Sequence, residues 1–378
     1  CGTPIYCIGP SAAYTPPSGP SYANQFSPFP SMSAAIAFLN TWSPTQHVIF
    51  EIQNNYTSGP EIYPIAITYS GNASATAVFR PRSDVASMIT ISGSLNGGSL
   101  GLFHLDCADY ITFDGSPGGI LGTTSNLMCR NTASSGTASA NFLLKNDATH
   151  NVINAMTIEG GNAAANCILL GSTLGSTGND FNSIQNCNIS NRSDLGVSNP
   201  NIAIYSFSSN SGPSGNSDNS ITGNKIINIS DGVVLSPSGS NGNWTISNNH
   251  FYFTIPSSFK ISEAISVNSN EPLTATITSN YIGGSAPFAA GSPMVETSSG
   301  LGFNGIYLNV SNTSPKSIVS GNTIKNYLRY STGLCSFQAI AIGSGPVDVI
   351  NNTIGDPSVS DDLSFISGVD LFFNAIIY

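Results

Sequence analysis

Acidic and basic side chains of the kinds that cleave polysaccharides gather in the first third of the sequence. Several carboxylates could hold a calcium ion, and a nearby arginine could act as the base of a lyase. Paired carboxylates could instead be the acid and the base of a glycoside hydrolase. The residues that carry these two hypotheses are Asp106, Asp109, Asp114, Arg80 and Arg82, with His104 beside the first aspartate.

The segment "DYITFDGS", residues 109–116, also has a purely structural interpretation. Asp109 and Asp114 flank a short alternating run, and aspartates at such places commonly bond to backbone amides in turns. No Gly-His-Gly or Arg-x-Lys sequence accompanies them, and the four histidines occur in unrelated contexts. The structural interpretation is favoured. We expect no metal or other cofactor unless these carboxylates bind calcium.

Composition narrows the classes of partner. Of the 378 residues, 8% are charged and 40% are hydrophobic, so a core is expected beneath a surface of hydroxyls and amides. The net charge of −10, with scattered lysines and arginines, argues against nucleic acid. No apolar run is long enough to span a bilayer. The sequence predicts an extracellular or cell-surface protein, with glycans among its expected partners.

An asparagine recurs at a fixed place in a short pattern. The pattern is an apolar residue, Asn three positions later and another apolar residue two beyond that, as in "ITGNKI" from Ile221. Met156 and Cys187 take the asparagine's place in the first two copies. Asparagine tolerates left-handed backbone, and stacked side-chain amides bond one another, so a structural turn ladder is predicted. Its members are Asn224, Asn249, Asn280, Asn322 and Asn352.

Each copy is followed by a short alternating apolar run such as "CILL" at 167 or "GIYL" at 305. Alternation with period two, bounded by Gly, Asn and Ser, predicts short strands. Short strands with one fixed turn residue and loops of variable length are typical of a parallel β-helix. We therefore predict an all-β protein, with residues 43–378 forming a single right-handed parallel β-helix domain.

A helix is expected over residues 31–42, "SMSAAIAFLNTW". Ser31 can cap its start, and Met32, Ala35, Ile36 and Leu39 recur at helical spacing. Such a helix would cover the apolar end of the first coil. The Pro-rich residues before it, 1–30, are predicted to be an extended leader.

The cysteines have no CxxC pair, which argues against a zinc or thioredoxin-type site. The separations of Cys107 from Cys129 and of Cys167 from Cys187 are plausible single-coil lengths, so disulfides between adjacent coils are one interpretation. Buried reduced thiols are the equally favoured alternative. A disulfide between Cys1 and Cys7 could close a small loop, which leaves Cys335 over.

The first 120 or so residues resemble a known group of proteins. The order of "YCIG", "AAIAFLN", "VIFEIQNNYTSG", "YPIAI", "FRPR" and "DYITFDG" is similar to the β-helix regions of large secreted surface proteins of Bacteroidetes-type bacteria. Those proteins are commonly exported by the type IX system. The resemblance implies a surface protein, whereas the rest of the chain shares only the general β-helix repeat.

The function predicted from the sequence is structural or adhesive rather than enzymatic. The apolar final segment, Ser367–Tyr378, favours contact between the ends of coils, and hence a homo-oligomer or a head-to-tail filament. The alternatives are a polysaccharide lyase or glycoside hydrolase built on a β-helix, and a carbohydrate-binding module that uses exposed Tyr and Phe.

Overall fold

A computed structural model provides the structure. It describes residues 3–10, 29–95, 100–119, 122–133, 139–161, 166–171, 175–195, 200–207, 214–257, 262–297, 302–311, 314–331, 335–356, 358, 362–367 and 371–377.

The described residues form three long parallel sheets and one short one. Sheet I comprises β1 (Ile5–Ile8), β2 (Val48–Ile52), β4 (Ala77–Pro81), β7 (Ile111–Asp114), β10 (Val152–Asn154), β13 (Ser183–Gln185), β16 (Ser220–Thr222), β19 (Gly242–Ser247), β22 (Leu273–Thr278), β26 (Ser317–Ser320) and β30 (Val347–Ile350). Sheet II comprises β5 (Ile89–Gly93), β8 (Leu127–Asn131), β11 (Thr157–Gly160), β14 (Asn188–Asn191), β17 (Lys225–Ile227), β20 (His250–Tyr252), β23 (Tyr281–Ile282), β27 (Thr323–Ile324) and β31 (Thr353–Ile354). Sheet III comprises β3 (Ile65–Ile67), β6 (Leu100–Asp106), β9 (Ser139–Lys145), β12 (Asn166–Leu170), β15 (Ile202–Ser206), β18 (Asp231–Leu235), β21 (Glu263–Ser269), β25 (Gly302–Val310), β29 (Cys335–Ser344) and β33 (Leu371–Ile377). The short sheet comprises β24 (Met294–Glu296), β28 (Tyr327–Ser331) and β32 (Leu363–Ser367).

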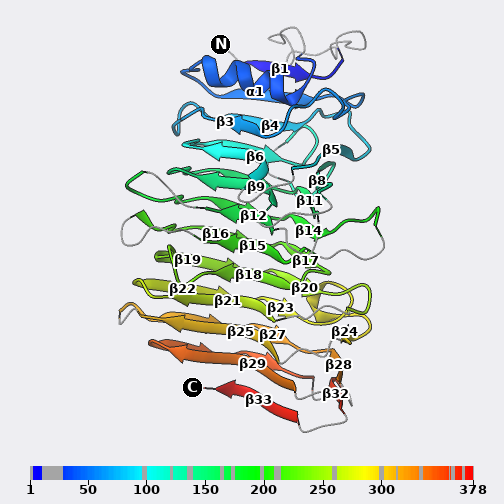
Figure 1. The fold of residues 1–378 in the computed structure, drawn as a ribbon, viewed down its shortest axis with the longest axis vertical. Helices are drawn as coiled ribbons and strands as arrows, with labels where there is room; N and C mark the ends of the chain where they lie inside the picture. The colour runs from blue at the N-terminus through cyan, green and yellow to red at the C-terminus, as the bar shows by residue number, and fades with distance from the viewer. Residues whose placement is uncertain are drawn as a thin grey trace.

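Each central coil takes one strand from each long sheet, as β10, β11 and β12 do, and the next coil repeats the order. Figure 1 shows the coils stacked from the N-terminal end to the C-terminal end. This arrangement is a parallel β-helix, which confirms the predicted fold class. Inward side chains at equivalent positions pair from coil to coil, as Ile184, Ile221 and Ile246 do, and they are buried in one continuous core.

The predicted helix is present as α1 (Met32–Thr41), at the N-terminal end of the stack in Figure 1. Ser31 caps it, because its Oγ accepts a hydrogen bond from the Ala34 amide at 3.1 Å. Met32, Ala35, Ile36 and Leu39 are its buried residues, and they join the core of the first coils. The helix therefore covers the end of the solenoid, as the hydrophobic spacing predicted.

The expected leader is partly wrong. Residues Ile5–Ile8 form β1, which pairs in parallel with β2 from Ile5 opposite Ile49 to Ile8 opposite Ile52. The four residues are buried. Tyr6 and Ile8 join the core that α1 covers, and the backbone adds a strand at the edge of sheet I. The remainder of the Pro-rich segment, 11–28, lies outside the described residues.

Candidate functional site

Two corners of the coil hold the residues singled out in the sequence. The first, called the amide corner, joins sheet I to sheet II. The second, called the aromatic corner, joins sheet III to sheet I. In both, a residue at an equivalent place of successive coils adopts a left-handed conformation that turns the chain. These residues at the amide corner are Ala155, Asn186, Gly223, Asn248, Ser279, Gly321 and Asn351, and at the aromatic corner they are Tyr110, His150, Phe181 and Asp218. At the aromatic corner Cys107, Asn146, Asp147 and Gly178 also have positive φ.

The structure places the five recurring asparagines in one line along the amide corner. The Nδ2 of Asn224 donates to Oδ1 of Asn249 at 3.0 Å, and the Asn224 backbone amide donates to the same oxygen at 3.0 Å. The same two bonds run from Asn249 to Asn280, onward to Asn322 and from there to Asn352. The first four side chains are wholly buried, so the ladder holds coils together and is closed to a ligand.

A second set of asparagine ladders was missed by the sequence reasoning. Asn151, Asn182 and Asn219 form one ladder beside the aromatic corner, with Asn151 donating to Asn182 at 3.0 Å and the Asn182 amide donating to Asn219 at 2.8 Å. Asn179 donates to Asn216 at 2.8 Å in another. The sequence contains a signal for these ladders, because an Asn stands two positions before the Ile that begins three copies of the asparagine pattern. The three segments are "NVI" (151–153), "NSI" (182–184) and "NSI" (219–221).

The disulfides between coils, one of the two interpretations of the cysteine spacings, are not formed. Cys129, Cys167 and Cys187 are buried free thiols, as the alternative interpretation predicted, and Cys107 is exposed. Cys107 lies at the aromatic corner and Cys129 lies in β8 of sheet II, whereas Cys167 lies in β12 of sheet III and Cys187 lies at the amide corner. The physical reason is coil length, since ladder partners are 25 to 42 residues apart and shorter separations fall on different sides of a coil. Burial raises the pKa of the Cys129 and Cys187 thiols to about 12, so they are unreactive core side chains.

The other cysteine predictions have different outcomes. Cys7 is a buried residue of β1. Cys1, its expected partner, lies outside the described residues, and so does the side chain of Cys335 at the start of β29.

Asp114 and Arg80 lie on adjacent strands of sheet I, at the end of one outward row. Asp114 Oδ1 accepts hydrogen bonds from the Ser116 amide and from Asn154 Nδ2, each at 2.9 Å. Arg80 Nη2 lies 2.8 Å from Glu51 Oε1, and its Nη1 donates to the Gly119 carbonyl at 2.7 Å. Both side chains therefore tie coils and a covering loop together.

The remaining candidates are separated from these two residues. Arg82 forms a two-pronged pair with Asp84, at 2.6 and 2.5 Å. Asp106, at the end of β6, lies 3.0 Å from Lys145 Nζ and accepts a bond from Asn146 Nδ2 at 2.5 Å. His104 points outward from β6, and burial together with Lys145 lowers its pKa. The structure thus brings Arg80 and Asp114 to one open groove of about 330 Å³, whereas Arg82 and Asp106 are held by other partners.

The calcium hypothesis receives no support from the carboxylates that the structure describes. Within these residues, no three His, Cys, Asp or Glu side chains are grouped so that they could hold a metal ion.

Asp109 belongs to a row of alternating hydroxyls and carboxylates on the outer side of the aromatic corner. Its Oδ2 accepts a bond from Ser70 Oγ at 2.5 Å, and its Oδ1 accepts one from Thr149 Oγ1 at 2.6 Å. Two coils later, Asp180 Oδ1 accepts the Ser217 amide at 2.7 Å. Burial raises the pKa of Asp180 to about 6, because its charged form loses solvation there.

Next to this row, three rings stack on the molecular surface. Tyr110 and His150 lie 4.6 Å apart between ring centroids with planes 7° from parallel, and His150 and Phe181 lie 5.0 Å apart at 24°. The three residues, called the aromatic column, come from consecutive coils and share the left-handed position. Phe181 is 55% exposed. Sequence reasoning missed them because the three side chains share no residue type.

An open groove of about 420 Å³ lies beside Asp109. Asp147 lines it and accepts the backbone amides of Ser176 and Gly178, each at 2.9 Å. Gly175 is required there, since a Cβ on it would lie 1.6 Å from an oxygen of Asp147. The lining residues are Ser70, Cys107, Asp109, Asn146, Asp147 and Gly175. The aromatic corner thus combines exposed rings with an acidic groove.

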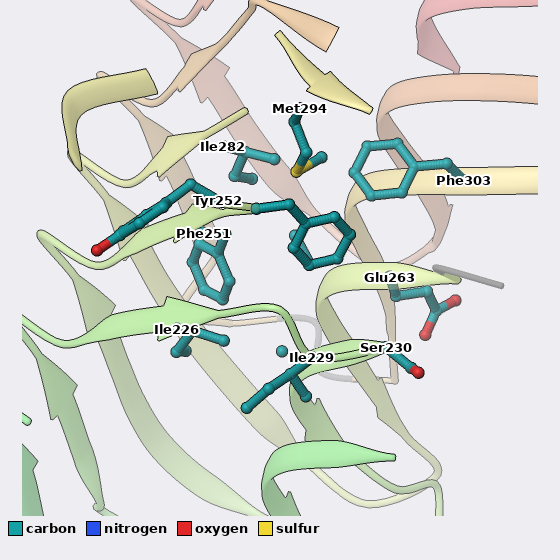
Figure 2. A pocket seen from close by; sticks show the side chains of 12 residues that line it. Ile226, Ile229, Ser230, Phe251, Tyr252, Glu263, Ile282, Met294 and Phe303 are labelled. Atoms are coloured by element: carbon teal, nitrogen blue, oxygen red, sulfur yellow. The ribbon is translucent and has the colours of Figure 1, made fainter. Parts of the chain in front are cut away.

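A small cavity and a buried polar cluster lie inside the molecule, unlike the exposed rings and the open groove. A cavity of about 20 Å³, room for roughly one water, lies between the sheets near the short sheet. Figure 2 shows the side chains of Ile282, Met294 and Phe303 facing one another there. Farther along, Tyr327 Oη donates to Glu296 Oε2 at 2.5 Å in a fully buried cluster, and burial raises the pKa of Tyr327.

No protein-family model matches the chain, and no curated protein matches it. Among solved structures, it is similar to an alginate lyase from Paenibacillus sp. str. FPU-7, at 12% identity and a TM-score of 0.45, over 86% of this chain and 97% of that one. It is also similar to PfbA, a surface adhesin of Streptococcus pneumoniae, at 11% identity and a TM-score of 0.34, over 91% and 88% of the two chains.

Proposed function

We propose that the chain is a secreted structural and adhesive β-helix of the bacterial cell surface. The observation that carries the proposal is the commitment of the candidate catalytic carboxylates to contacts between coils. Asp106, Asp109 and Asp114 each accept at least two hydrogen bonds or ion-pair contacts from neighbouring segments. Groups engaged in this way stiffen the stack, whereas a general acid or base must reach the proton that it transfers.

The long axis and the composition support the same role. Eleven strands of sheet I at the ~4.8 Å spacing of paired strands make a rod roughly 50 Å long. In the part of the chain that the structure describes, no helix is long and apolar enough to cross a bilayer. Export by a type IX system and assembly into filaments belong to the proposal, on the strength of the sequence resemblance and the solenoid form.

The test combines shape with turnover. Electron microscopy of the purified protein is expected to show rods or end-to-end filaments, and incubation with alginate, pectate and neutral glucans is expected to release no oligosaccharides. Release of unsaturated uronic-acid products, followed by their ultraviolet absorbance and abolished by Asp109→Ala, would overturn the proposal in favour of a lyase.

A further inference from the structure

The aromatic column occupies backbone positions that are unfavourable for rings. Tyr110, His150 and Phe181 each have φ of 57°, a left-handed conformation that Gly and Asn adopt most easily. The amide corner fills the equivalent positions only with small residues or Asn, as at Gly223 and Asn248. A bulky residue held in this conformation costs of order 1 kcal/mol or more, and such residues cluster where a ligand is held.

Core packing does not account for these rings. His150 is exposed and Phe181 is 55% exposed, so they bury only a part of their apolar surface. Stacking within the column offsets part of the strain, since a parallel aromatic pair contributes roughly 0.5–1.5 kcal/mol. An asparagine at the same places would serve the turn without strain. The rings are therefore better explained by the aromatic surface that they present to a ligand than by a contribution to the stability of the fold.

Phe181 is the last ring of the column and has an open side. On the next coil, the equivalent left-handed position holds Asp218, which has no ring to cover Phe181. Asp218 Oδ1 accepts a bond from Asn243 Nδ2 at 3.0 Å, and its Oδ2 accepts one from Ser217 Oγ at 2.8 Å. The exposed ring is thus followed, at the same position of the next coil, by a carboxylate that is hydrogen-bonded to an amide.

This combination matches the chemistry of a sugar ring. The π face of an aromatic ring carries partial negative charge and attracts the C–H groups on the apolar face of a pyranose. A carboxylate on the next coil accepts hydrogen bonds from neighbouring hydroxyls, and such charge-assisted bonds are stronger than neutral ones. The amide of Asn243, which is exposed, supplies both a donor and an acceptor.

The charges select among saccharides. Asp109, Asp147, Asp180 and Asp218 all lie along this corner. Nearby Lys145 is paired with Asp106. These carboxylates repel the carboxylates of a polyuronate, so that a polyuronate is disfavoured and a neutral chain is accepted.

We infer that the open side of Phe181, together with Asp218 and Asn243, is a binding site for neutral hexose oligosaccharides. The inference rests on the proposed adhesive function and names the ligand class of that function.

The experiment is isothermal titration of the full chain with hexaoses of glucose, mannose and galactose, and with a hexauronate as the polyanionic comparator. At least one neutral hexaose is expected to bind, and the hexauronate is expected to bind at least tenfold more weakly. Phe181→Ala should weaken the binding of the neutral hexaose at least tenfold. Asp218→Asn should weaken it severalfold.

Phe288→Ala is the matched control. Phe288 is also an exposed phenylalanine with a left-handed backbone, at 61% exposure and φ of 66°, but it lies edge-on to His250 and Tyr281 beside sheet II. Its substitution should leave the affinity unchanged. Circular dichroism and the urea midpoint of Phe181→Ala establish that this variant is folded.

Three results would overturn the inference: no binding of any neutral hexaose, an equal loss in both phenylalanine variants, or preference for the hexauronate. None of these results depends on the shape of the particles or on product release. Failure of the ligand assignment is therefore distinguishable from failure of the adhesive proposal.

Discussion

The amide corner and the aromatic corner both turn the chain through left-handed residues, but they use different residue types at these positions. Each has a left-handed residue at an equivalent place of successive coils. The amide corner uses small residues or Asn there and places a buried Asn next in the chain, so that its polar groups bond from coil to coil. The aromatic corner turns through rings and leaves them at the surface. Stability explains the first choice, whereas the second is explained by ligand contact.

The largest effect is expected at the centre of the amide ladder. Asn249→Ala removes the bonds that Asn249 Nδ2 donates to Asn280 Oδ1 and to the Ile221 carbonyl, together with the acceptor used by Asn224. Because buried polar groups are then left without partners, the free energy of unfolding should fall by about 2–4 kcal/mol in urea titrations.

The control for that change is Asn248→Gly. Asn248 is exposed, with φ of 56°, and glycine adopts this conformation freely. Its free energy of unfolding should stay within about 0.5 kcal/mol of the parent's. Equal losses in the two variants would contradict the distinction between ladder and turn residues.

The second effect concerns pH at the aromatic corner. The pKa of Asp180 is raised to about 6 from 3.8, so the unfolded chain releases this proton more readily than the folded one. Its contribution to stability is full below about pH 4 and is lost as the pH rises through 6, by up to about 2–3 kcal/mol. Urea titrations from pH 4 to pH 7 should show this loss.

Asp180→Asn tests the assignment, because an amide does not titrate in this range. The variant should lack the loss, whereas Asp218→Asn should keep most of it, because burial is the largest cause of the raised pKa of Asp180 and the charge of Asp218 is a smaller one. A pH dependence that persists unchanged in Asp180→Asn would place its origin in another group.

A smaller, stabilising effect is expected where the amide ladder stops. The backbone amide of Cys187 donates to Asn224 Oδ1 at 2.9 Å, and its thiol lies 3.5 Å from the Ile153 carbonyl. Cys187→Asn would extend the side-chain ladder by one coil. Thermal and urea unfolding should show a gain of about 1 kcal/mol, the typical net contribution of a hydrogen bond. A loss of similar size would mean that the thiol's packing outweighs the added bonds.

The smallest effect separates binding from stability. Phe181→Asn replaces a strained, exposed ring with a residue that favours the left-handed conformation. The free energy of unfolding should change by less than about 0.5 kcal/mol, although oligosaccharide binding is lost. A destabilisation above about 1 kcal/mol would show that the ring is retained for packing, and would weaken the contrast between the corners.

The helix and the repeat were readable from the sequence because they depend on local patterns. Ser31 and the spacing of Met32, Ala35, Ile36 and Leu39 predicted α1 closely, since capping and amphipathicity act within a few residues. The inward residues that accompany each ladder asparagine, such as Ile221 and Ile226, were recognised through their repetition.

The predictions that needed long-range register were less accurate. Cys107 and Cys129 were paired on an assumed coil length, and β1 was placed in the leader, because sequence separation does not say which sheet a residue joins. The candidate catalytic residues were chosen by proximity along the chain. In the folded chain, Arg82 pairs with Asp84, and Asp106 pairs with Lys145.

The sequence by itself determined that this chain is a parallel β-helix with an apical helix and an asparagine at a recurring bend. Period-two alternation and turn residues are properties of short segments, and both recur many times along the sequence. Only the tertiary structure decided which residues meet from coil to coil. Tyr110, His150 and Phe181 share no motif, and variable loops separate them in the chain. They form one column because each coil returns the chain to the same corner, about one strand spacing further along the axis.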